Sequence, residues 1–172
     1  CVPGISPLSF SPKAVEVVQN RKTQIQSWFL DQTLVMGYWS GEGKRSYHHT
    51  APVNSLYALH EALVMLHDEG LENSWARHKE QHEVLAKGLK ELGIEFIVPE
   101  EERLPQLNAI YIPEGADDAK IREYLLEHYN LEIGAGLGAF AGKAWRIGLM
   151  GHAAKSENVA LCLTALKDAL SQ

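Results

Sequence analysis

Residues 132–151, with the sequence EIGAGLGAFAGKAWRIGLMG, join a glycine-rich run to an apolar segment that carries one cation, Arg146. Side chains alternate between the two faces of a strand, so Arg146 would face one side while Trp145 and Ile147 face a core. Burying a guanidinium without an anion is unfavourable, so an anion should bind beside Arg146. The sequence leaves open whether that anion is a protein carboxylate in a salt bridge or the carboxylate of a substrate.

The rest of the chain alternates between strand and helix patterns. Apolar periodicity, with serine, proline and glycine at the boundaries, predicts helices at residues 12–20, 30–38, 52–68, 72–92, 117–128 and 156–170. Strands are predicted at residues 8–10, 94–98, 109–112, 131–133 and 144–150. From residue 94 onward this order predicts an α+β fold, in which helices cover one face of a small, mostly antiparallel sheet.

Length and composition exclude several classes of protein. The 172 residues suit one domain, or one domain with an extension, and the formal charge of -6 argues against a protein that coats nucleic-acid duplexes. No apolar run approaches the length of a membrane span, and the N-terminal segment lacks the charged start and apolar core of a signal peptide. Cys1 and Cys162 have neither metal nor redox spacing, which predicts free thiols and a cytoplasmic protein.

Gly134, Gly136 and Gly138 have the density of a nucleotide phosphate loop, but such loops lead into a helix whose N-terminus binds the anion. Here the glycines lead into a predicted strand. We therefore interpret the run as a connector. A functional variant of this interpretation is a loop whose backbone closes over a ligand bound at Arg146.

The segment Tyr47-His48-His49-Thr50 contains two adjacent histidines, which project to different sides in any regular structure. No further ligand stands at metal spacing, so no metal site is predicted. Tyr47 and Thr50 place two hydroxyls just ahead of a helix N-terminus, an arrangement that suits a phosphate group. The alternative is that these hydroxyls only cap the helix.

Three segments together resemble the class V, fold-type I pyridoxal-phosphate aminotransferases, closest to the alanine–glyoxylate and serine–pyruvate aminotransferases. They are RSYHHTAPVNSLY at residues 45–57, GLENSWARH at residues 70–78, and the run from Gly136 to Gly151. The opening PGISPLSFSPKA resembles the family segment that lies a few residues after the lysine holding the cofactor. The resemblance covers the whole chain in order and implies pyridoxal 5'-phosphate as the cofactor.

The resemblance also implies roles for individual residues. Tyr47 and Thr50 match the positions that reach across a dimer to the cofactor phosphate of the neighbouring subunit. Arg146 matches the arginine that binds the α-carboxylate of the substrate. No residue matches the Schiff-base lysine, the aspartate at the pyridine nitrogen or the aromatic that stacks on the ring. These are expected upstream of Cys1, so no catalytic residue is predicted within this chain.

In the domain organisation that the resemblance implies, residues 1–71 are the end of a large cofactor-binding domain with a dimer-contact segment. Residues 72–92 are a connecting helix, and residues 93–172 a C-terminal small domain. The expected function is the C-terminal portion of a homodimeric aminotransferase that moves an amino group from alanine or serine to glyoxylate or pyruvate. The alternatives are a non-catalytic dimerisation fragment and another class V enzyme, such as a lyase or desulfurase relative, which would need a reactive loop cysteine.

Overall fold

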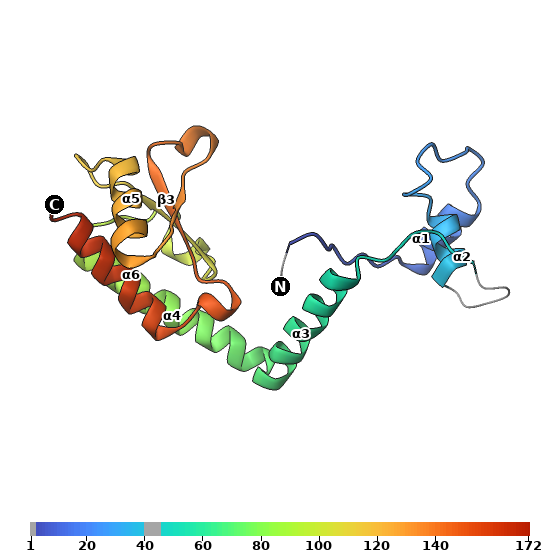
Figure 1. The fold of residues 1–172 in the computed structure, drawn as a ribbon, viewed down its shortest axis with the longest axis horizontal. Helices are drawn as coiled ribbons and strands as arrows, with labels where there is room; N and C mark the ends of the chain where they lie inside the picture. The colour runs from blue at the N-terminus through green and yellow to red at the C-terminus, as the bar shows by residue number, and fades with distance from the viewer. Residues whose placement is uncertain (1–2, 40–45) are drawn as a thin grey trace. The chain divides into compact units, whose positions relative to one another are not determined.

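The computed structural model of the chain describes residues 3–39 and 46–172. The chain divides into two compact units, Cys1–Met65 and Leu66–Gln172, and the division falls inside helix α3 (Val53–Glu69). Figure 1 shows the elements of both units. Within the described residues, no helix is long and apolar enough to cross a membrane.

The first unit contains α1 (Pro12–Gln19), α2 (Gln32–Trp39) and most of α3. Helix α1 begins where the sequence predicts, because the Ser11 hydroxyl accepts a hydrogen bond from the Ala14 N–H at 3.3 Å and Pro12 occupies the first helical position. The prediction of a strand at residues 8–10 is wrong. These residues pair with no strand in the described part of the chain, and Leu8 is 81% exposed.

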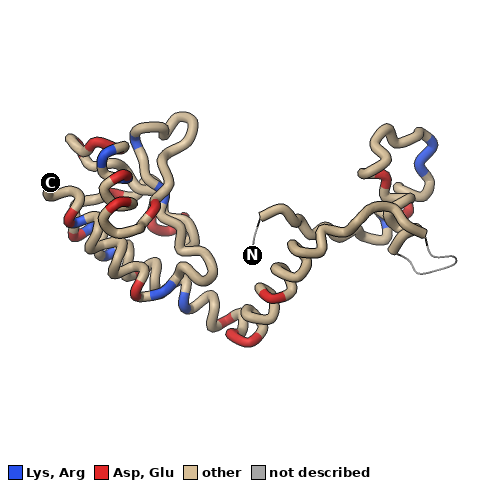
Figure 2. The backbone as a smooth tube through the Cα atoms, viewed as in Figure 1, with Lys and Arg blue, Asp and Glu red and all other residues tan. Residues whose placement is uncertain are grey.

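The second unit has the α+β fold that the sequence predicts. Its three antiparallel strands lie in the order β1-β3-β2, so β3 is central. In chain order the elements are α4 (Leu71–Glu91), η1 (Glu100–Glu102), β1 (Leu107–Tyr111), α5 (Asp118–Tyr129), β2 (Gly134–Ala135), η2 (Gly138–Phe140), β3 (Ala144–Gly148), η3 (Gly151–Ala153) and α6 (Ser156–Ala169). Acidic and basic residues are interspersed along the helices of this unit (Figure 2).

Two predicted strands differ from the structure. Residues 94–98 form only one bridge, between Phe96 and Ile110, because Pro99 follows and the Val98 carbonyl turns to accept a hydrogen bond from Arg103 Nε. Strand β2 lies at Gly134–Ala135 instead of residues 131–133. The preceding Asn130 adopts a left-handed conformation that ends α5, so the chain is still leaving the helix at residue 131.

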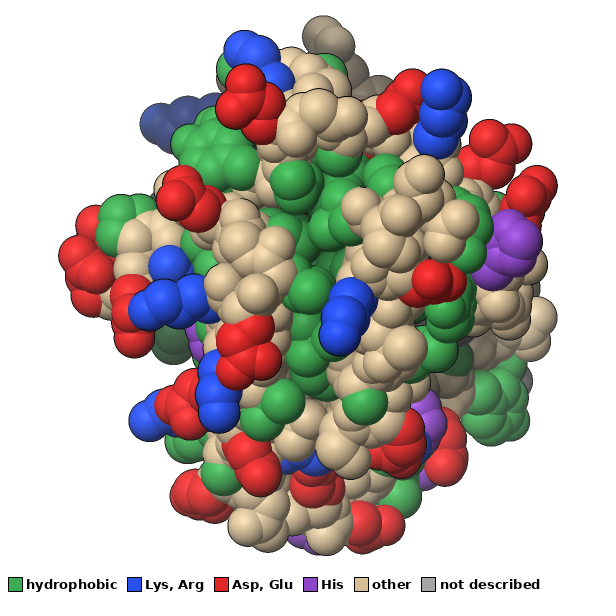
Figure 3. Space-filling view, turned by 90° about the vertical axis from the view of Figure 1, so that its left-hand side faces the viewer, with side chains coloured by type: hydrophobic (Ala, Val, Ile, Leu, Met, Phe, Trp, Pro, Cys, Tyr) green, Lys and Arg blue, Asp and Glu red, His purple; other side chains and the backbone are tan. Residues whose placement is uncertain are grey.

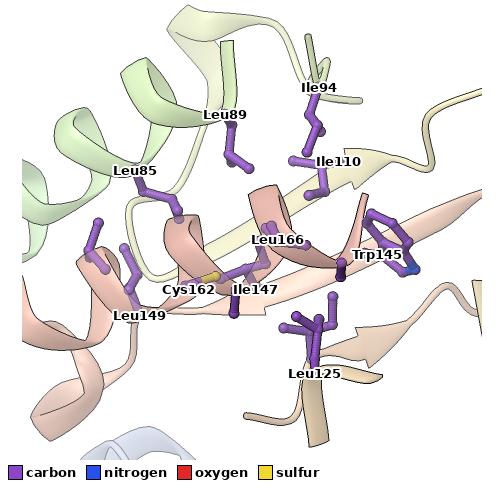
Figure 4. Close-up of a cluster of buried hydrophobic side chains, with 14 of the residues drawn as sticks. Leu85, Leu89, Ile94, Ile110, Leu125, Trp145, Ile147, Leu149, Cys162 and Leu166 are labelled. Atoms are coloured by element: carbon purple, nitrogen blue, oxygen red, sulfur yellow. The ribbon is translucent and has the colours of Figure 1, made fainter. Parts of the chain in front are cut away.

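One face of the sheet packs against α4, α5 and α6 and forms the core. Trp145 and Ile147 of β3 point inward, as the alternation in the sequence predicts, and are 0% and 5% exposed. Figure 4 shows apolar side chains from the helices and the sheet pointing toward one another, among them Leu85, Leu89, Ile110, Leu125, Trp145, Ile147 and Leu166. Burial of side chains of this size is the main stabilising contribution to this unit.

Trp145 is anchored by more than packing. Its indole Nε1–H donates a hydrogen bond to Asp118 Oδ1 at 2.9 Å, so α5 and β3 are joined through one carboxylate. The same oxygen accepts a hydrogen bond from Arg122 Nε at 2.8 Å. The neighbouring Arg122 guanidinium is the main reason that the pKa of Asp118 lies below its ordinary value, and the Trp145 hydrogen bond adds to the shift.

We expect Asp118→Ala to lower the free energy of unfolding by about 2 kcal/mol, because the buried indole N–H of Trp145 loses its acceptor. Chemical denaturation at neutral pH measures this change. The control Arg122→Ala removes only a partly exposed ion pair and should cost less than about 1 kcal/mol. Equal losses for the two variants would contradict the importance of the indole contact.

The pH dependence of stability, compared between the wild type and Asp118→Ala, gives a second test. Since folding lowers the pKa of Asp118, its contribution to stability is complete above the ordinary carboxyl pKa of about 3.9 and is lost as the pH falls through the lower folded value. The stability difference between the wild type and Asp118→Ala should therefore shrink below about pH 4.

Candidate functional site

Arg146 lies in the middle of the central strand β3, on the sheet face opposite the helices. Ala109 of β1 stands opposite it on one side and Gly134 of β2 on the other. The side chain is half-buried, and its Nε–H donates a hydrogen bond to the Ala135 carbonyl at 2.8 Å. The sheet therefore holds this arginine from both sides and ties one of its nitrogens to the backbone.

A salt bridge within the same domain was one of the two explanations for Arg146. Among residues 3–39 and 46–172, no carboxylate oxygen lies within 4.0 Å of its guanidinium, and the ion pairs present join other residues. The hydrogen bond to Ala135 is to a neutral acceptor. In the described part of the chain the two Nη groups therefore remain available for an anion.

The glycine-rich run is the hairpin connection between β2 and β3. The Gly136 N–H donates to the Ala144 carbonyl at 2.8 Å, and the Lys143 N–H donates to the Phe140 carbonyl at 3.0 Å. A strand follows the loop, as predicted, so it lacks the helix N-terminus of a phosphate loop. A Cβ at residue 136 would lie 2.0 Å from the Phe140 carbonyl oxygen, so this closed turn requires glycine there.

Tyr47 and Thr50 lie together ahead of α3. Their hydroxyl oxygens are 2.6 Å apart, and Tyr47 is 72% exposed. Helix α3 begins at Val53, three residues after Thr50. The Tyr47 and Tyr38 rings are nearly perpendicular, with their centroids 6.1 Å apart, and Tyr38 belongs to α2. The structure thus brings together the two hydroxyls that the sequence singled out, at a surface open to a ligand.

The two histidines between them are packed against aromatic residues. His48 is buried and stacks on Trp28 with ring centroids 4.0 Å apart, while its Nε2 lies 3.1 Å from the Trp28 carbonyl oxygen. His49 contacts the edge of Phe29. Among the described residues, no cluster of three or more His, Cys, Asp or Glu side chains could hold a metal ion. This packing fixes the segment that presents Tyr47 and Thr50.

A second set of contacts holds the turn after β3 and was not predicted from the sequence. Arg77 donates to the carbonyls of Gly151 and Ala154, each at 2.8 Å. The Gly151 N–H donates to His78 Nε2 at 3.0 Å, so both polar groups of this residue's backbone are bound by α4. Glu69 forms a two-pronged ion pair with Arg77 and holds it in place. Residues 70–78 and the run that ends at Gly151 are each a recognisable sequence motif. Neither motif indicates that these two segments are in contact.

The unit Leu66–Gln172 has two well-defined hollows that Arg146 does not line. One, of about 200 Å³, lies between residues 131–133, the end of β3 and α6. The other, of about 620 Å³, lies between the segment 113–121 and the end of α6. Figure 3 shows the face on which apolar side chains line a hollow between charged ones. Arg146 instead lies on an open sheet face.

The buried thiol of Cys162 is unsuited to nucleophilic chemistry. It lies in α6, 4% exposed, and burial raises its pKa to about 11. A reactive cysteine needs a lowered pKa and exposure. Cys162 therefore does not supply the loop nucleophile that a desulfurase relative would need.

Comparison with known proteins assigns this chain to a family. The family model for class-V aminotransferases matches residues 3–160. The chain belongs to the class-V aminotransferase family. The enzymes of this family depend on pyridoxal 5'-phosphate.

Individual class-V aminotransferases are similar over almost the whole chain. The alanine–glyoxylate aminotransferase of Rattus norvegicus is 45% identical over 170 residues, which are 98% of this chain and 41% of the relative. The (S)-ureidoglycine–glyoxylate transaminase of Bacillus subtilis is 32% identical, over 97% of this chain and 44% of the relative. The crystal structure of an alanine–glyoxylate aminotransferase from Nostoc sp. superimposes with a TM-score of 0.89 at 44% identity, covering 99% of this chain and 45% of that one. The chain thus spans less than half the length of these relatives.

Among the described residues, one pair of side chains has chemistry that suits a cofactor phosphate. The exposed hydroxyls of Tyr47 and Thr50 converge before a helix N-terminus, and hydroxyl donors there suit a phosphate. Because one hydroxyl hydrogen is used in the bond between the two residues, the other hydroxyl can donate to the phosphate.

We expect Gly136→Ala to destabilise the hairpin by about 1–3 kcal/mol, because its methyl group would overlap the Phe140 carbonyl. Thermal or chemical unfolding measures the loss. Gly148→Ala is the matched control, since a Cβ at this end of β3 meets nothing within 4 Å. Wild-type stability in both variants would contradict the close approach at residue 136.

Proposed function

We propose that this chain is the C-terminal portion of a cytoplasmic, homodimeric aminotransferase that moves an amino group from alanine or serine to glyoxylate or pyruvate. The observation that carries the proposal is Arg146, which is half-buried on an open sheet face with no carboxylate partner in the described residues. Membership of the class-V family and 45% identity to an alanine–glyoxylate aminotransferase support this choice of reaction.

Arg146 binds the α-carboxylate of the amino acid, and afterwards that of the oxo acid. Its planar fork matches a carboxylate through two parallel charge-assisted hydrogen bonds. The Ala135 carbonyl holds the fork at its Nε, so the bound carboxylate is fixed in orientation as well as in place. The Cα–H of the substrate is thereby aligned for proton removal.

Tyr47 and Thr50 bind the cofactor phosphate of the neighbouring subunit. Their hydroxyls form a pair at the N-terminus of α3, where the helix dipole favours negative charge. When bound, pyridoxal 5'-phosphate supplies the electron sink for the chemistry at the substrate Cα. Tyr47 and Thr50 supply the phosphate contact across the dimer, and Arg146 binds the substrate carboxylate.

The proposal includes the domain assignment that the resemblance to the class V enzymes implies. Residues 1–71 are the end of the large cofactor-binding domain, residues 72–92 the connecting helix and residues 93–172 the small domain. The large-domain segment carries Tyr47 and Thr50, and the small domain carries Arg146. A desulfurase relative is disfavoured by the buried Cys162 with its raised pKa.

In the full-length enzyme, Arg146→Ala should raise KM for both the amino acid and the oxo acid roughly a hundredfold, since two charge-assisted hydrogen bonds are lost. Steady-state kinetics with each substrate varied in turn measures the change. The dissociation constant of the cofactor should stay within about twofold, because that constant reports a different contact. Arg146→Lys keeps the charge without the fork, so its KM should lie between that of the wild type and that of Arg146→Ala. An unchanged KM in Arg146→Ala would contradict the assignment of Arg146 as the residue that binds the substrate carboxylate.

Tyr47→Phe and Thr50→Val should each weaken binding of pyridoxal 5'-phosphate roughly tenfold, because each removes a hydroxyl from the phosphate contact. Titration of the apoenzyme, followed by cofactor absorbance, measures the constant. Pyridoxal without its phosphate should bind the variants and the wild type alike. Tyr57→Phe is the matched control, because Tyr57 is also an exposed tyrosine, at 74%, near the start of α3. Wild-type cofactor affinity in both Tyr47→Phe and Thr50→Val would contradict the phosphate role of these two hydroxyls.

A further inference from the structure

The orientation of the Arg146 fork is restricted by one hydrogen bond. A guanidinium presents two edges to a carboxylate, one formed by Nε and an Nη group and the other by the two Nη groups. The Nε–H of Arg146 already donates to the Ala135 carbonyl at 2.8 Å. The edge that remains for two parallel hydrogen bonds is therefore the Nη1–Nη2 edge.

Gly134, the residue before Ala135, makes room for this arrangement. It stands directly opposite Arg146 in the β2–β3 pairing. A Cβ at residue 134 would lie 3.3 Å from Arg146 Nη2 and 3.4 Å from its Nε and Cβ. The distance to Nη2 is tighter than an ordinary contact, so the guanidinium would have to shift by a few tenths of an ångström, whereas 3.4 Å lies at the limit of ordinary contact.

Backbone conformation does not explain the glycine at this position. Gly134 is absent from the glycines with positive φ, so an alanine could adopt its backbone conformation without strain. Gly136, two residues later, is required by a backbone clash, whereas the atoms nearest a Cβ at residue 134 all belong to one side chain, Arg146. The close approach of that side chain is what the missing Cβ permits.

We propose that Gly134 is a positioning residue, which together with the Ala135 carbonyl holds the Arg146 fork so that the substrate carboxylate is bound end-on through Nη1 and Nη2. This inference rests on the proposed function of Arg146. A methyl group at residue 134 pushes the guanidinium away from β2 and strains its bond to Ala135. The fork is then misdirected, although every hydrogen-bond donor of Arg146 is still present.

The test compares Gly134→Ala with Gly148→Ala in the full-length enzyme. Both glycines lie beside Arg146, but a Cβ at residue 148 meets nothing within 4 Å. Gly134→Ala should raise KM for amino acid and oxo acid roughly tenfold, because small misplacements of a binding group weaken substrate positioning. The kcat should fall by a smaller factor than KM rises, because most of the carboxylate contact is already made in the bound substrate and only its orienting part acts on the Cα–H. Gly148→Ala should match the wild type.

Propionate, a carboxylate with no amino group to react, gives a second readout. Its competitive inhibition constant should rise in Gly134→Ala by the same factor as KM and stay unchanged in Gly148→Ala. Wild-type KM and inhibition constant in Gly134→Ala would overturn the positioning role, and so would equal rises in the two variants. Arg146→Ala separates the positioning role of Gly134 from the proposed function of Arg146. If Arg146→Ala raises KM and Gly134→Ala does not, only the positioning role is contradicted.

A double-mutant cycle keeps the proposal testable if Gly134→Ala folds poorly. The contact it would disturb is with the Arg146 side chain, so adding Gly134→Ala to Arg146→Ala should cause little further loss of stability and no further rise in KM. Thermal unfolding of the two single variants and the double variant measures the coupling. Additive effects on stability and KM would overturn the proposal, because they would place the clash somewhere other than Arg146.

Discussion

The hydrogen bond from Trp145 to Asp118 fixes which way the central strand faces. The indole is fully buried, and its N–H finds an acceptor on α5, so β3 cannot slip by one residue without losing both the packing and the polar contact. With Trp145 held inward, its neighbour Arg146 must point to the opposite face. The position of the candidate carboxylate site is thus a consequence of how the core is built.

The half-buried arginines of the second unit differ in how their charge is compensated. Arg77 pairs with Glu69, and Arg122 pairs with Asp118. Arg103 lies over the Phe96 ring at 4.0 Å and donates to a carbonyl. Among the described residues Arg146 has only the Ala135 carbonyl. In a unit where its counterparts are matched with an acid or an aromatic ring, the uncompensated guanidinium is the feature that most calls for an external anion.

Local signals predicted the helices better than the strands. The Ser11 cap lies at a helix start, where the deciding hydrogen bond spans three residues. Strand pairing depends on distant partners, so residues 8–10 had strand-like composition and no strand to pair with in the described chain. The same limit applies to the site. The sequence identified Arg146, Tyr47 and Thr50, but the contacts of α4 with Gly151 join residues more than seventy positions apart.

The glycines around Arg146 show why the sequence could not resolve the site further. Gly134, Gly136 and Gly148 are the same letter, yet a Cβ would meet a side chain at the first, a backbone carbonyl at the second and open space at the third. A phosphate-loop pattern treats such glycines as one signal, namely freedom of the backbone. In this hairpin the glycines differ in what lies beside them, and that depends on the pairing of β2 with β3. The spacing that suggested a loop for nucleotides is better explained by a narrow turn beside an arginine that needs room.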